Sequence, residues 1–168
     1  RVENLFVYVF DAQGNRLYSH FYDYTNRKDP LPSTPGNWWR VSNRTSSNDN
    51  DTRGEVMIKA PVMTGGSIYL IANLNADQLN ISADQLNIIG TLEELKDLTI
   101  TMNQEITSRT GYFLMTGHVD GISVDGTGKI TQGNATTVTV PLVRLDAKVT
   151  VNVQVGGATL EGQEMQDF

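Results

Sequence analysis

Apolar and polar residues alternate with a period of two in several stretches of this 168-residue chain, which is the pattern of β-strands. Residues 2–10 (VENLFVYVF) include an unbroken run of apolar side chains, which predicts a strand covered on both faces. A turn at residues 11–15 leads to residues 16–24, where the two kinds of side chain alternate again. This stretch therefore predicts a β-hairpin.

The rest of the chain predicts more strands and two helical turns. Ser82 with Gln85, and Thr91 with Glu94, form capping boxes that each open a short helix. The chain is therefore expected to be mainly β, as an antiparallel β-sandwich with a short helical insertion. The further predicted strands cover residues 55–62, 66–74, 109–119, 136–142 and 143–155, and residues 121–131 predict a hairpin that turns at residues 125–128.

The apolar positions change phase between the last two predicted strands. They are even-numbered in residues 138–142 and odd-numbered in residues 143–155. One regular strand cannot bury both sets on one face, because its side chains alternate between faces. We therefore expect a bulge or corner at Pro141–Val143, where proline interrupts the ladder and a new strand begins. The outward face of that new strand would carry Arg144, Asp146 and Lys148.

Residues 25–54 are rich in proline, glycine and asparagine and predict an irregular excursion. Trp38 and Trp39 lie within it, between Asn37 and Arg40. The two tryptophans either fold back over the sheet as a lid on the core, which we favour, or stand out to bind a sugar ring or a protein partner.

Composition limits the function. Hydrophobic residues make up 39% and charged residues 19% with a net charge of −6, so we expect one globular domain that repels nucleic acid. The lack of cysteine excludes disulfides, thiolate zinc sites and cysteine nucleophiles. The sequence contains no phosphate-binding or hydrolase motif, and the spacing of His20 and His118 does not favour catalysis or metal binding. We expect no cofactor and no enzymatic activity.

Five segments occur in a characteristic order: VENLFVYVFDAQGN, GSIYLIANLN, GTLEELKDL, GYFLMTG and VPLVRLDAKVTVNV. Together they resemble the N-terminal domain of the fimbrillins, the Mfa-like and major-fimbrium subunits of type V pili in Gram-negative anaerobes. The resemblance spans most of residues 2–155. Residues 1–158 would form this domain, and residues 159–168 a tail or linker towards the second β-domain that the family carries.

The resemblance implies a transthyretin-like β-sandwich. It also implies a lipoprotein precursor that is exported to the outer membrane, and a mature subunit in the fimbrium at the cell surface. Fimbrillins polymerise by β-strand exchange after an arginine-specific protease removes an N-terminal segment, and a strand from the next subunit fills the vacated groove.

We therefore hypothesise a structural and adhesive subunit of bacterial surface fimbriae. Its partners would be other fimbrial subunits, through strand complementation, and a host or bacterial surface protein or glycan. The alternative is a surface glycan- or protein-binding module that uses the loop of Trp38 and Trp39. The core or groove-lining positions that would contact another subunit are Leu5, Val7, Val9, Val149, Val151 and Val153.

Overall fold

The strand with the unbroken apolar run lies at the centre of the fold. The structure, a computed structural model, describes residues 2–41, 54–74, 80–100 and 113–145. Strand β1 (Leu5–Phe10) is buried along its whole length. It pairs in antiparallel fashion with β2 (Arg16–Tyr22) on one side and with β5 (Met63–Ala72) on the other. The prediction of a strand covered on both faces is confirmed.

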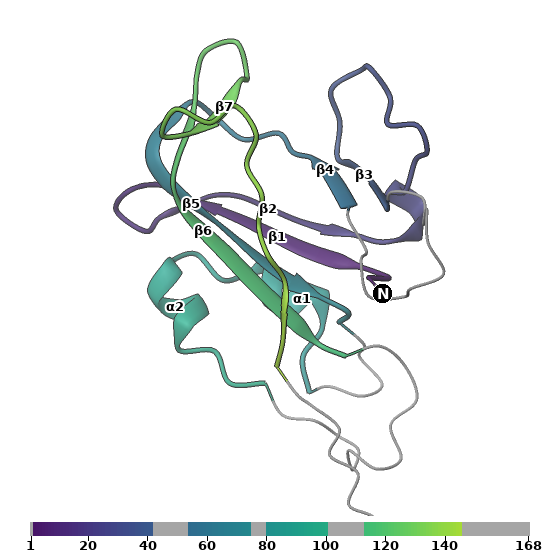
Figure 1. Cartoon of the computed structure of the whole chain (residues 1–168). Coiled ribbons are helices and arrows are strands. Elements are labelled where there is room, and N and C mark those ends of the chain that lie inside the picture. The colour runs from purple at the N-terminus through teal and green to yellow at the C-terminus, as the bar shows by residue number, and fades with distance from the viewer. Residues whose placement is uncertain (1, 42–53, 75–79, 101–112, 146–168) are drawn as a thin grey trace, which may run out of the picture.

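Within the described residues, six strands form one antiparallel sheet in the order β2-β1-β5-β6-β7, with β8 also pairing with β6 (Figure 1). Strand β6 spans Met115–Val124, β7 spans Ile130–Gln132 and β8 spans Val143–Arg144. Strands β3 (Trp38–Val41) and β4 (Gly54–Met57) pair separately as a two-stranded sheet. The chain is therefore mainly β with antiparallel sheets, as the alternation predicts.

Two short helices, α1 (Ala83–Asn87) and α2 (Leu92–Lys96), cover one face of the six-stranded sheet. Both begin at the predicted capping boxes. The Tyr8 hydroxyl donates a hydrogen bond to the carbonyl oxygen of Leu86 over 2.6 Å and so ties β1 to α1. We call the buried side chains on this face the helix-side cluster: Phe6, Tyr8, Phe10, Ile71, Leu74, Ile81, Leu86, Ile89 and Leu114.

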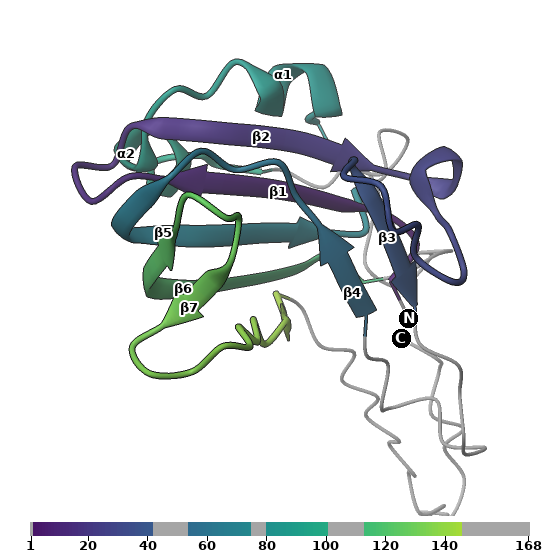
Figure 2. The same ribbon diagram turned by 90° about the horizontal axis from the view of Figure 1, so that it is seen from above.

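The opposite face of the six-stranded sheet carries the two-stranded sheet, on the far side from the helices (Figure 2). The fold therefore has a second β layer, but only two strands wide among the described residues. We call the buried side chains between the two layers the inner cluster: Leu5, Val7, Val9, Tyr22, Trp39, Met63, Ile68, Ala72, Ile122 and Val124.

The structure differs from the prediction in several strand boundaries. Strand β3 forms within residues 25–54, which the sequence predicts to be irregular, because its four residues are too short for their alternation to stand out. The predicted strand 55–62 ends as β4 at Met57. Of the predicted strand 109–119, residues 109–112 lie outside the described part, and β6 begins at Met115.

Candidate strand-acceptor site

An extended segment without strand partners crosses the inner-cluster face of the sheet. In residues 137–142, Val138, Val140 and Leu142 are half-buried and pack against the inner cluster, whereas the residues between them are exposed. Within the described residues this segment belongs to no ladder and makes no backbone hydrogen bond. Its side chains therefore have the arrangement of a strand, while its backbone N–H and C=O groups lack the partners that a strand has.

This segment lies on the same side of the sheet as the two-stranded layer. In both views β4 lies between β3 and the segment (Figures 1 and 2). The outer side of β3 is already occupied, since Lys28 donates its backbone N–H to the Trp39 carbonyl oxygen over 2.9 Å. Strand β4 pairs only with β3 among the described residues. The second layer thus has one open edge, and that edge is on the side of the segment.

Half-buried apolar side chains from both layers and from the segment pack against the inner cluster without being fully covered. They come from β4, the residue after it, β5, β6 and the segment itself. An added strand with apolar side chains at alternate positions would bury them. We call this set the acceptor strip: Val56, Ile58, Leu70, Met115, Val119, Val138, Val140 and Leu142.

The outer edge of β6 is open over a short stretch. Strand β7 pairs with residues 122–124 and β8 with residues 115–116, which leaves residues 117–121 without a described strand partner on that side. The Leu114 and Asp120 carbonyl oxygens accept hydrogen bonds on this side, from the Leu145 N–H and the Gln132 side chain. Because the backbone N–H and C=O groups of successive residues point to alternate edges of a strand, those of residue 118 also point to this outer edge of β6.

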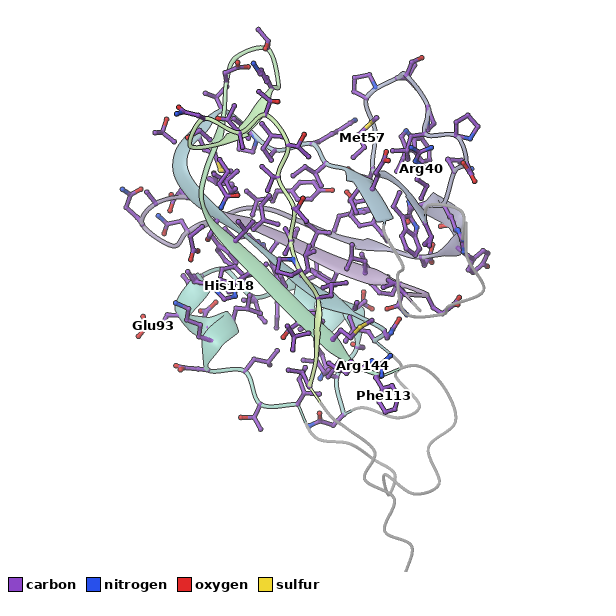
Figure 3. All side chains as sticks on the ribbon, viewed as in Figure 1. Arg40, Met57, Glu93, Phe113, His118 and Arg144 are labelled. Atoms are coloured by element: carbon purple, nitrogen blue, oxygen red, sulfur yellow. The ribbon has the colours of Figure 1, made fainter. Side chains whose placement is uncertain are left out.

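The phase change of the apolar positions coincides with the start of β8. Up to Leu142 the even-numbered side chains pack on the inner cluster, and at Val143 the chain joins β6 opposite Thr116. The start of β8 at Val143 agrees with the predicted new strand, but in the described part of the chain residues 136–142 form no ladder that Pro141 could interrupt, so the strand predicted there is wrong. Val143 and Leu145 are 64% and 56% exposed in this structure, and the Arg144 guanidinium lies 5.1 Å from the centre of the Phe113 ring (Figure 3).

The proposed contact residues of β1 have their side chains in the inner cluster. Leu5, Val7 and Val9 are 4%, 1% and 0% exposed, and β1 has strand partners along both edges. The structure therefore places these three residues in the core of this chain. The other three proposed contact residues, Val149, Val151 and Val153, lie outside the described residues.

The two tryptophans have different surroundings. Trp39 is 2% exposed, and its Nε1 donates to the Asp23 carbonyl oxygen over 2.6 Å, so it covers the core as a lid. Trp38 is half-buried, its ring packs against Gly36, and the Lys28 ammonium lies 5.5 Å from the ring centre. Of the two, only Trp38 keeps an accessible ring surface for a ligand.

The two histidines lie on opposite faces of the sheet. His20 pairs with Val7 and faces the inner cluster, whereas His118 stacks on Tyr69 on the helix side with ring centres 4.9 Å apart. His118 borders an open groove of about 430 Å³ between β6 and α2. The histidines therefore do not converge. In the described part of the chain, no three carboxylate or histidine side chains come together as a metal site.

The comparisons with known proteins give no relatives: no family model, no curated protein and no solved structure matches this chain. Among the described residues no helix is both long and apolar enough to cross a membrane.

Proposed function

We propose that this protein is a structural and adhesive subunit of bacterial surface fimbriae, and that it accepts a β-strand from another subunit at the acceptor strip. The observation that carries this proposal is the extended segment 137–142, which is half-buried at alternate residues and has no backbone partner in the described chain. Residues 140–142 of this segment begin VPLVRLDAKVTVNV, one of the five segments through which the sequence resembles the fimbrillins.

An added strand would supply this surface with backbone hydrogen bonds and would bury its half-buried apolar side chains. The incoming backbone supplies hydrogen bonds to the segment, each of which contributes about 0.5–1.5 kcal/mol net. Its apolar side chains, at every second position, pack on the half-buried side chains of Leu70 and Met115. A side chain such as Val or Leu contributes about 1.5–3 kcal/mol when it is fully buried. A few such residues suffice for a stable joint between subunits.

The finer parts of the proposal come from the resemblance. The second layer, once completed by the incoming strand, would make the fold a transthyretin-like β-sandwich. The subunit would be exported as a lipoprotein precursor and reside in the fimbrium at the outer membrane. A net charge of −6 would keep unassembled subunits apart in solution, because like charges repel.

A peptide-binding experiment tests the proposal. The probe is a synthetic peptide with the sequence of residues 147–155 (AKVTVNVQV), which alternates valine with polar residues. Added in excess, it should raise the melting temperature of the protein, because a ligand that binds only the folded state stabilises it. A control peptide with threonine in place of the valines should have no effect.

A pair of neighbouring variants locates the binding surface. Val140→Glu places a charge on the half-buried side of the segment, whereas Thr139→Glu places it on the exposed side. The first variant should lose the peptide effect and the second should keep it. Val140→Ala, which removes apolar surface without adding charge, should weaken the effect and shows that the loss is not due to misfolding. Equal responses of all variants would refute the proposed site.

A further inference from the structure

His20 lies at the contact between β2 and the two-stranded layer. Its ring stands between two tyrosines on the same face of β2, with ring centres 4.8 Å from Tyr22 and 6.4 Å from Tyr18. The ring of Tyr22 meets it edge-on, at an interplanar angle of 82°. Any change in the volume or charge of this imidazole therefore acts directly on both tyrosines.

These two tyrosines hold the second layer onto the sheet. The Tyr22 hydroxyl donates to the Met57 carbonyl oxygen at the end of β4 over 2.8 Å. The Tyr18 hydroxyl lies 2.8 Å from the side-chain oxygen of Asn37, just before β3, and 2.8 Å from the Tyr22 hydroxyl. The hydroxyls thus form one small network that links β2 to both strands of the layer.

The imidazole itself fits this place only when it is neutral. The Nε2 of His20 is buried and has no hydrogen-bond partner in the described structure. A neutral ring can carry its hydrogen on Nδ1 and leave Nε2 bare, whereas a protonated ring has an N–H at both nitrogens. Protonation would therefore create a buried, charged N–H without an acceptor, which is a costly arrangement.

The surroundings supply little compensation for a positive charge. The charged group that acts on His20 is Asp23, at the end of β2, whose carboxylate is already bound by the backbone N–H and hydroxyl of Thr25. From the two-stranded layer, Asn37 and the Met57 carbonyl bind the tyrosines and carry no charge. Burial lowers the pKa of His20, and the attraction of Asp23 only partly opposes this.

We propose that His20 is an acid-sensitive latch, which holds the two-stranded layer on the sheet when neutral and releases it when protonated. Release would expose the inner cluster beside the acceptor strip. The consequence for strand acceptance rests on the proposed function, whereas the latch itself is a property of the isolated chain and is measured without any partner.

The direction of the pH effect follows from the two protonation states. A histidine whose pKa is lower in the closed form binds fewer protons there than in the open form. The closed form is therefore fully favoured above the ordinary histidine pKa of about 6.5 and loses its advantage as the pH falls below that value. Within this window the opening equilibrium shifts by up to about tenfold per pH unit.

Hydrogen exchange of the second layer tests the latch. The amides of Trp38–Val41 and Gly54–Met57 are followed from about pH 7.5 to about pH 5, with correction for the intrinsic exchange rate. Wild type should lose protection at these amides as the pH falls, while β1 stays protected. His20→Gln should show no such loss. His118→Gln is the matched control, since these are the only two histidines, and it should behave as wild type.

Two results would overturn the latch: acid-induced loss of protection that persists in His20→Gln, or a wild type with no loss. Proton NMR of the two histidine rings gives a second test that needs no variant. The His20 ring should titrate below the ordinary histidine pKa, and a His20 pKa at or above about 6.5 would contradict the proposal. None of these readouts depends on strand acceptance, so the two proposals fail separately.

Discussion

Gly117 in β6 lies directly against Pro141: a Cβ atom at residue 117 would overlap the carbonyl oxygen of Pro141. This contact brings the extended segment 137–142 close over the sheet at the open part of the β6 edge. A glycine is needed at this point because any side chain would push the two backbones apart. The pair therefore fixes the position of the acceptor strip.

Replacing this glycine should displace the segment. Gly117→Val adds a branched side chain where none fits, and we expect a loss of about 1–3 kcal/mol in the free energy of unfolding. Urea denaturation measures it. Gly126→Val is the matched control, because nothing lies within 4 Å of a Cβ at residue 126. Equal stability of the two variants would show that the close approach of Gly117 and Pro141 does not exist.

The hydrogen bond between Tyr22 and Met57 should contribute measurably to stability. Tyr22→Phe removes the hydroxyl and leaves the half-buried Met57 carbonyl oxygen without that donor, so we expect a loss of about 1–2 kcal/mol. The control Tyr24→Phe removes a hydroxyl from a side chain that is 82% exposed and should change stability by less than about 0.5 kcal/mol. Thermal or urea unfolding of both variants compares the two effects.

Val7 should behave as a core residue. Val7→Ala deletes two methyl groups from a side chain that is 1% exposed, and we expect a loss of about 2 kcal/mol or more, including the cavity it leaves. Val62→Ala makes the same chemical change at a position that is 68% exposed and should have little effect. If Val7→Ala left stability unchanged and instead reduced binding of the AKVTVNVQV peptide, Val7 would line a groove rather than the core.

Variants of the two tryptophans should differ in their effects: the loss of Trp39 should lower stability, and the loss of Trp38 tests ligand binding. Trp39→Ala removes a buried ring and its hydrogen bond to Asp23, and should cost about 3–5 kcal/mol. Trp38→Ala should cost much less. A glycan array with wild type and Trp38→Ala tests the alternative function: if wild type binds glycans and this variant does not, the loop is a ligand site, and our account of the tryptophans as a lid is incomplete.

The sequence predicts those parts of the fold whose signal is local. The apolar run of β1, the period of two in β2 and the two capping boxes all appear as predicted. The sequence does not predict β3, because Trp39 and Val41 form a single two-residue repeat among prolines and asparagines. These residues form a strand because they pair with β4.

The acceptor site shows the limit of the same signal. Alternation at Val138, Val140 and Leu142 predicts a strand, yet alternation reports only that one side is buried, and it says nothing about backbone pairing. Likewise, the opposite placement of His20 and His118 depends on the register between β2, β1, β5 and β6. Register is set by long-range pairing and cannot be read from either histidine's neighbours in sequence.

In the joint that we propose, the backbone of residues 137–142 receives its hydrogen bonds from another subunit. The most direct measurement is hydrogen exchange at the amides of Val138, Thr139, Val140 and Leu142, first in the monomer and then in SDS-resistant multimers of the same protein. The account predicts fast exchange in the monomer and strong protection of alternate amides of this segment in the multimer. Multimers in which all four amides still exchange fast would contradict it.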